Sequence, residues 1–201
     1  MDTFSKILKY TDMGMAGLNI LLFPPTEIAD MAEQDLGFIS HASTGLTITG
    51  GLTSLLSFIH NREAHWTIKW IVIPLIILHV AALAVLFGVA GAGSFGKFKE
   101  LAKKGMSLIS PGLTTLTGGY LIYEMMSEPE ENMTVANFGG VIYKLPAIMA
   151  YTPLKQTPYY AIVILIRSGG LVTQSVGGFI EILEAGNAEQ KKLAAEMKEE
   201  S

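Results

Sequence analysis

The histidines of this chain gather in one part of the sequence, and they are its clearest candidates for chemistry. All four occur between positions 41 and 79, and two of them, His41 and His79, fall within long apolar runs. A neutral imidazole is a common ligand of haem iron, and its lone pair can bind the magnesium of a chlorophyll in the same way. We therefore expect His79 and His41 to be metal ligands of haem b or of a chlorophyll-type tetrapyrrole. The alternative is that one histidine is packed and hydrogen-bonded inside a membrane, while the other three are interfacial.

The depths of the two histidines restrict this hypothesis. His79 lies near the middle of its apolar run, whereas His41 lies about five residues inside its own. At a helical rise of 1.5 Å per residue, their depths would differ by roughly 10 Å. One iron could bind both only if the first helix is tilted or shifted.

Arg167 is the other residue that predicts a site. It follows the run AIVILI and precedes SGGL, so it lies inside an apolar segment. A charge within a membrane costs several kcal/mol unless it is paired, reaches the interface or faces a polar cavity. We expect it to bind a cofactor, through a haem propionate or a quinone carbonyl, or else to pair with Glu124 or a lipid phosphate. The alternative is an arginine that reaches the interface from a helix beginning later in the chain.

The segments that must position these residues read as membrane helices. Half of the 201 residues are hydrophobic and 16% are charged, whereas a soluble domain has about 25% charged residues. From Ile71 to Ala92 there is no Asp, Glu, Lys or Arg. As a helix, that stretch would cover roughly 33 Å, enough to cross a hydrocarbon core of about 30 Å. The sequence predicts an all-α, polytopic transmembrane bundle.

The pattern along the chain divides this bundle into parts. We expect four spans, at about 36–59, 68–92, 106–126 and 158–183. Residues 1–35 form an interfacial N-terminal helix, which Pro24 and Pro25 should end, followed by an acidic linker. Residues 135–153 carry Lys144 and Pro146 and form a re-entrant segment or a short span. A polar helical tail occupies 184–201.

The lysines predict the orientation of the four spans. The loop between the second and third spans carries four lysines (Lys97, Lys99, Lys103 and Lys104). Positively charged loops stay on the cytoplasmic or equivalent inner side, so both termini should lie inside as well. We expect an energy-transducing membrane, either a bacterial or archaeal inner membrane or the inner membrane of an organelle.

Glycine pairs recur at similar places in three of the spans, within TGLTITGG, GLTTLTGG and GLVTQSVGG. They could record an old duplication, but helices that cross closely need small residues in any case, and we favour that explanation. No GxxxxGK[ST], GxGxxG, HExxH or GxSxG pattern occurs, so nucleotide loops and the common hydrolase motifs are excluded.

The overall composition excludes further classes. The chain has no cysteine and a net charge of −4. Disulfides, thiolate metal sites and covalently attached haem are therefore excluded, and nothing favours nucleic acid as a partner. Whether the protein is an enzyme stays open.

One stretch resembles a known family. In FISHASTGLTITGG, the residues His41, Thr44, Gly45 and Gly51 resemble the first-span motif SIxHRxTG and its later glycine in the cytochrome b membrane anchors of succinate dehydrogenase and fumarate reductase. The motif's arginine position holds Ala42. The resemblance implies a second-span histidine as a haem b ligand, which would be His79.

Three functions remain open from these residues. The first is an integral membrane subunit of an electron-transfer complex that binds haem b or a related tetrapyrrole and contacts quinone. The second is a non-catalytic subunit that docks with other subunits of a larger membrane complex. The third is a small transporter or channel lined by Arg167, Gln174 and Lys144.

Overall fold

The computed structural model describes residues 3–34, 36–61, 66–91 and 96–199, and every regular element within these ranges is a helix. This confirms the all-α prediction. The elements are α1 (Thr3–Met31), α2 (Phe38–Asn61), α3 (Trp66–Gly91), α4 (Gly96–Ser127), α5 (Pro129–Asn132), α6 (Val135–Lys144), the 3₁₀ helices η1 (Leu145–Tyr151) and η2 (Pro153–Gln156), and α7 (Tyr160–Glu199).

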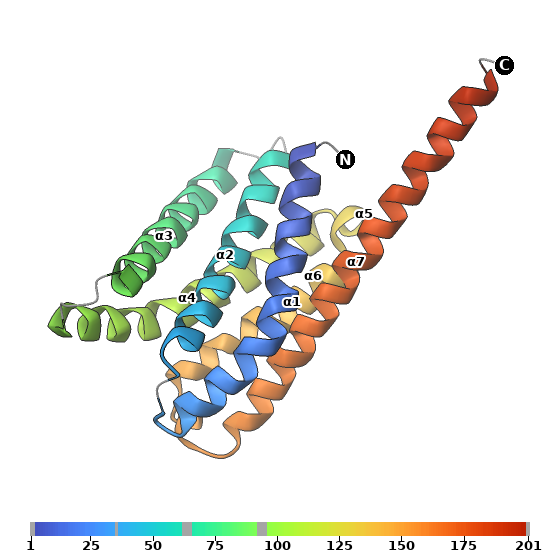
Figure 1. Cartoon of the computed structure of the whole chain (residues 1–201). Helices are drawn as coiled ribbons and strands as arrows, with labels where there is room; N and C mark the ends of the chain where they lie inside the picture. The colour runs from blue at the N-terminus through green and yellow to red at the C-terminus, as the bar shows by residue number, and fades with distance from the viewer. Residues whose placement is uncertain (1–2, 35, 62–65, 92–95, 200–201) are drawn as a thin grey trace.

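The N-terminal helix α1 lies on one face of the bundle, between α2 and α7, and packs against both (Figure 1). It runs antiparallel to α7, because Lys9 near its start pairs with Glu181 and Glu27 near its end pairs with Arg167. The remaining helices continue this packing: α2 contacts α3 and α4, and α6 lies against α7 and α4. One face of α1 is therefore available to line the interior.

The prediction that Pro24 and Pro25 end the N-terminal helix is wrong. The helix runs through Pro24 and Pro25 to Met31. A proline inside a helix costs about 3 kcal/mol, but here the chain is packed on both sides of the pair, with Phe23 and Ala29 buried. Tertiary packing of this kind supplies most of the stability of a helix in a protein, and it outweighs the missing hydrogen bonds.

Each predicted span overlaps one long helix, α2, α3, α4 or α7, whose ends differ from the prediction. Helix α4 begins at Gly96, so the expected four-lysine loop is largely helical, and α7 continues through the expected polar tail. The segment 135–153 is a short helix that changes to 3₁₀ geometry at Leu145, next to Pro146, in keeping with the interruption expected there. The loop around His65 and residues 93–95 lie outside the described residues.

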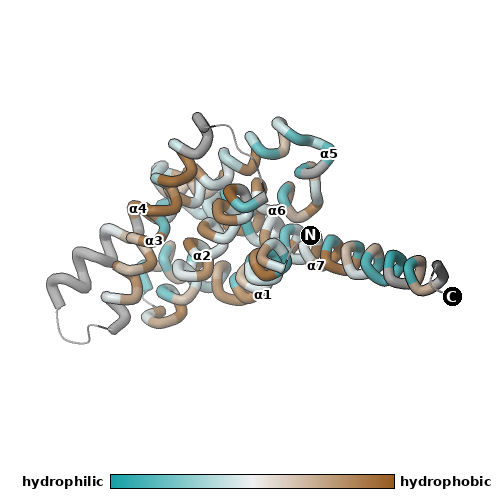
Figure 2. Tube along the Cα trace, turned by 90° about the horizontal axis from the view of Figure 1, so that it is seen from above, coloured by the Kyte–Doolittle hydropathy of each residue, from teal (hydrophilic) through white to brown (hydrophobic). Residues whose placement is uncertain are grey.

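Two helices of the described chain are long and apolar enough to cross a membrane, within Trp70–Gly88 of α3 and within Tyr160–Met197 of α7. They correspond to the second and fourth predicted spans. Helices α2 and α4 carry many Gly, Ser and Thr residues, which lower their hydropathy. Figure 2 shows hydrophobic residues on α3 and hydrophilic ones towards the end of α7.

Large apolar side chains cover much of the outside of these two helices. On α3, Ile71 and Ile77 are each 61% exposed, and on α7, Leu165 is 71% exposed. The interior, in contrast, holds many polar side chains. Those that are buried are Ser5, Asn19, Ser43, Thr53, His79, Thr114, Thr117, Glu124, Lys144, Arg167 and Gln174. They lie among apolar core residues such as Leu55 and Leu171, and a soluble domain seldom buries charged groups or exposes so many large apolar ones.

Candidate functional site

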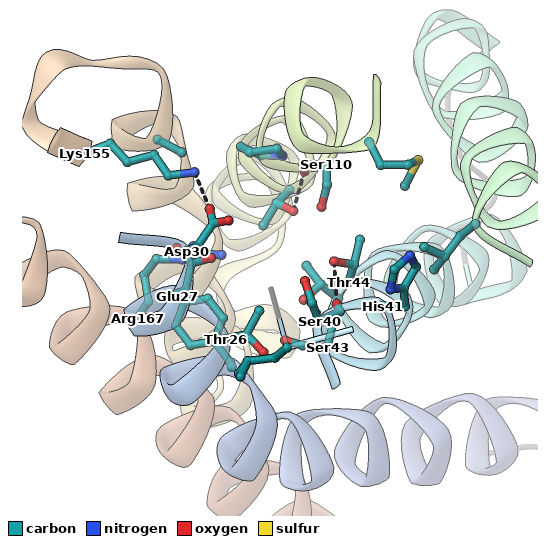
Figure 3. A pocket seen from close by; sticks show the side chains of 18 of the residues that line it. Thr26, Glu27, Asp30, Ser40, His41, Ser43, Thr44, Ser110, Lys155 and Arg167 are labelled. Atoms are coloured by element: carbon teal, nitrogen blue, oxygen red, sulfur yellow. Dashed lines mark hydrogen bonds and ion pairs between the residues drawn. The ribbon is translucent and has the colours of Figure 1, made fainter. Parts of the chain in front are cut away.

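A cavity of about 450 Å³ lies where α1 ends and α2 begins. Its wall comes from both of these helices, from α4 and α7, and from the 3₁₀ segments (Figure 3). The side chains around it include hydroxyl groups, a histidine and an arginine. Those used below are His41, Ser43, Thr44, Thr47, Ser110 and Arg167.

Arg167 is buried at one side of this cavity. Its Nε donates a hydrogen bond of 3.0 Å to the backbone oxygen of Tyr143. The guanidinium carbon lies 4.3 Å from the ring centre of Phe23 and 4.9 Å from that of Tyr143. Such contacts favour a cation over an aromatic face. The arginine is thus held in one orientation from two helices.

The charge of Arg167 is balanced by Glu27 of α1. The Nη1 to Oε1 distance is 3.5 Å, and the hydroxyl of Tyr160 donates to the other oxygen of Glu27 at 3.3 Å. From the sequence, Glu124 is a candidate partner of Arg167, because residues 1–35 are predicted to lie at the interface. The antiparallel packing of α1 on α7 brings Glu27 there instead.

His41 lines the same cavity as Arg167. Its Nδ1 lies 2.7 Å from the backbone oxygen of Gly37. Because a carbonyl oxygen only accepts, Nδ1 must carry the hydrogen. The neutral ring then keeps its lone pair on Nε2, which can accept a hydrogen bond or bind a metal. The structure therefore brings together two of the three site residues predicted from the sequence.

The third, His79, is not among the described residues that line this cavity. Its side chain is 1% exposed, and its Nδ1 donates to the oxygen of Leu75 at 2.7 Å. Its Nε2 lies 3.4 Å from Thr117 Oγ1 and packs against Gly51, where an added Cβ would lie 2.6 Å away. The Nε2 atom of His79 therefore faces Gly51 and Thr117 in this structure, and a haem held jointly by His41 and His79 stays a prediction.

Among the described residues, no three His, Asp or Glu side chains gather closely enough to hold a metal ion. His60, in turn, packs edge-on against Phe4 with ring centres 4.7 Å apart. Of the three described histidines, His41 alone lines the cavity.

Sequence reasoning missed the polar residues that join α1 to this cavity. Asn19 Nδ2 donates to Tyr143 Oη at 3.0 Å, and Ser43 Oγ donates to Asn19 Oδ1 at 2.9 Å. The hydroxyls of Thr47 and Tyr143 are 2.6 Å apart. A usable signal was present, since Asp12, Asn19 and Glu27 are spaced seven and eight residues apart. That spacing puts them on one face of a helix.

The cavity can therefore bind a small group that carries oxygen atoms. Arg167 offers donors and His41 Nε2 offers an acceptor. The hydroxyl oxygens of Ser43, Thr44 and Thr47 can accept as well, because their own hydrogens are donated within the chain. Asp30 is paired with Lys155 at 2.6 Å, so two of the three carboxylates on the cavity wall are paired with a cation, and Glu33 adds a third negative charge. A neutral ligand suits such a site better than a strongly charged one.

Comparison of the chain with family models, with curated proteins and with solved structures gives no match. The function must therefore be argued from the cavity and its surroundings.

Proposed function

We propose that this chain is an integral membrane subunit of an electron-transfer complex and that its cavity binds the head group of a quinone. The observation that carries the proposal is the meeting of His41 and Arg167 at one cavity inside a bundle with an apolar exterior. A quinone dissolves in the bilayer and presents two oxygen atoms on a flat ring. The cavity supplies groups for both.

The membrane placement rests on where the polar and apolar side chains lie. Of the apolar window in α3, 28% is buried, so most of this helix would face water if the protein were soluble. We place the four predicted spans in α2, α3, α4 and α7. The polar residues of α2 and α4, such as Thr53 and Thr117, are buried, which explains how helices of modest hydropathy can stand in lipid.

The same placement includes α1 in the bundle. It lies along α7 from Glu181 to Arg167, and therefore at the same depth as that span. We accordingly propose α1 as a bundle helix instead of an interfacial one. Its polar face is covered by α2 and α7.

Quinone chemistry gives His41 and Arg167 different roles. The oxidation of a quinol to a quinone releases two electrons and two protons. His41 Nε2 can accept a hydrogen bond from one quinol hydroxyl and take that proton, and the Glu27 carboxylate beside Arg167 can take the second, as the two electrons leave for a redox cofactor of a neighbouring subunit. Arg167, fixed by Tyr143 and Glu27, would donate to the ring oxygen on its side of the cavity.

The test is the binding of a short-chain benzoquinol to the detergent-purified protein, measured by titration calorimetry. We expect His41→Ala to weaken binding about tenfold, which corresponds to the loss of one hydrogen bond of about 1.4 kcal/mol. His60→Ala is the matched control, because His60 lies against Phe4 and away from the cavity. Equal binding by wild type and His41→Ala would contradict the proposal.

A tetrapyrrole is a second candidate, favoured by the hydrogen bond that fixes His41 Nδ1. Metal-bound histidines usually donate their other ring nitrogen to a carbonyl or carboxylate, and His41 does so to Gly37. Haem b would then have His41 as its axial ligand and supply redox chemistry of its own. The visible spectrum of the same preparation decides this: a Soret band should disappear in His41→Ala and persist in His79→Ala. A colourless protein that binds no quinol would favour the accessory-subunit function.

A further inference from the structure

One face of α1 carries polar residues along almost its whole length, each joined to another helix. They are Lys9, Asp12, Asn19 and Glu27, which we call the α1 seam. Lys9 pairs with Glu181 of α7, and Glu27 pairs with Arg167 of α7. The two ends of the seam are thus ion pairs, and the Glu27–Arg167 pair borders the cavity.

The part of the seam nearest Lys9 is centred on Asp12. Gln174 Nε2 of α7 donates to Asp12 Oδ2 at 2.7 Å, and Thr53 Oγ1 of α2 lies 3.3 Å from Oδ1. Both neighbours are neutral, and Gln174 and Thr53 are buried. A carboxylate is thus held in the middle of three helices by amide and hydroxyl groups.

A buried lysine lies within electrostatic reach of this carboxylate. Lys144, at the end of α6, is 2% exposed, and its Nζ donates to Ser54 Oγ at 3.0 Å. Asp12 of α1 and Glu124 of α4 act on its charge electrostatically, and Lys144 acts in the same way on His79 of α3. Gly118 of α4 fixes this position, because a Cβ there would lie 2.9 Å from Lys144 Cβ.

The middle of the seam is a neutral hydrogen-bonded group. Asn19 contacts Thr47 Oγ1 and Tyr143 Oη, both at 3.0 Å, and accepts from Ser43. Thr47 and Ser43 also line the cavity. This layer therefore links the cavity to the interior of the bundle through hydroxyl groups.

The seam is as long as a membrane is thick. From Lys9 to Glu27 it covers 18 residues, or about 27 Å of helix, close to the roughly 30 Å of a hydrocarbon core. Polar and ionisable groups inside a membrane are expensive and usually mark ion or proton pathways. A row of such groups from one ion pair to the other needs a function beyond packing.

We propose that the α1 seam conducts protons across the membrane, between the cavity at Glu27 and the Lys9–Glu181 pair. The proton moves through the carboxyl groups of the seam, the hydroxyl groups that contact it (Ser43, Thr47, Thr53 and Tyr143) and the water between them, with Asp12 as the carboxylate nearest the Lys9–Glu181 pair. No bond other than those to hydrogen is made or broken. This inference rests on the proposed membrane placement and is independent of quinone binding.

The experiment uses the full chain reconstituted into liposomes that enclose a pH-sensitive dye. A potassium gradient with valinomycin sets the membrane potential, and the rate of the internal pH change measures proton flux. We expect flux clearly above that of protein-free liposomes. Asp12→Asn should reduce it to the protein-free level, and Asp12→Glu should retain it.

The control removes a carboxylate that also joins α1 to α7 but lies outside the seam. Glu189 pairs with Lys6 at 2.8 Å on the surface, so Glu189→Gln should leave the flux unchanged. Wild-type flux no greater than that of empty liposomes overturns the proposal, even if a variant fails to fold. Full flux in Asp12→Asn, or a flux that requires Na⁺ in place of protons, overturns it too. The quinol titration is unaffected by these outcomes and tests the cavity separately.

Discussion

His79 shows how a single glycine decides the environment of a buried histidine. The ring of His79 on α3 occupies the space beside Gly51 of α2, within reach of Thr117 on α4. Three helices thus meet around one imidazole, and its Nδ1 is satisfied by its own helix at Leu75. This accounts for the histidine as a packed interior residue.

The first prediction concerns this contact. In Gly51→Ala, the new Cβ would lie 2.6 Å from His79 Nε2, so the ring or the helices must shift. We expect a loss of about 1–3 kcal/mol in the free energy of unfolding, as for other overpacked cores. Denaturant unfolding in detergent measures it.

Gly119→Ala is the appropriate control for Gly51→Ala, since no described atom outside its own helix lies within 4 Å of the Cβ position there. That variant should keep its stability or gain up to about 1 kcal/mol from helix propensity. If both variants unfold alike, the Gly51–His79 contact contributes little.

At the scale of elements, the recurring glycine pairs mark the places where helices cross closely. In each pair one glycine makes the tight contact: Gly51 against His79, Gly118 against Lys144 and Gly177 against Ala136. This confirms the expectation that the spans carry small residues at their crossings. The closest of these crossings is that of α6 on α7, where backbone meets backbone.

The second prediction follows from the α6–α7 crossing. A Cβ at Gly177 would lie 2.3 Å from the backbone nitrogen of Ala136, and one at Gly170 would lie 2.4 Å from that of Tyr143. Backbone atoms cannot move aside as a side-chain tip does. We expect Gly177→Ala to cost about 3 kcal/mol or more, measured by the same unfolding assay.

Gly169→Ala lies on the same helix, where no described atom outside the helix comes within 4 Å of the new Cβ. It should unfold like the wild type. A stable, normally folded Gly177→Ala protein would show that α6 does not pack on α7 in this way.

The comparison of sequence and structure also belongs to this scale. The uncharged run of α3 and the apolar start of α7 could be assigned from hydropathy, because a long apolar helix has one simple signature. The continuation of α1 past Pro24 and Pro25 could not, since it depends on burial of Phe23 and Ala29 by other helices. Tertiary packing overrides local propensity there.

The candidate site, too, could be predicted only in part from the sequence. Arg167 could be singled out because a charge stands out in an apolar run, and His41 because its imidazole does. Glu27 could not be paired with Arg167, since 140 positions separate them in the sequence and the antiparallel packing of α1 on α7 alone brings them together. Hydropathy also could not show that His41 lines the cavity while His79 is buried between helices.

At the scale of the whole molecule, the question is what covers the apolar exterior. Ile77 on α3 and Leu165 on α7 are exposed within the chain itself, and so is Glu130 in the polar segment after α4. In water all three positions would react alike with a polar reagent. In a membrane, lipid would cover the first two and leave the third open, because a charged reagent does not enter the hydrocarbon core.

The chain has no cysteine, so single cysteines can be placed at these positions without a background. In membrane sheets open on both sides, we expect a charged maleimide to label Glu130→Cys rapidly and to leave Ile77→Cys and Leu165→Cys unlabelled. Dissolving the sheets in denaturing detergent should make all three reactive, which controls for local reactivity. Equal labelling of Ile77→Cys and Glu130→Cys in the intact sheets would mean that water covers α3. The seam would then no longer cross a hydrocarbon core, and the carboxylate of Asp12 and the buried charge of Lys144 would need an explanation that does not involve a membrane.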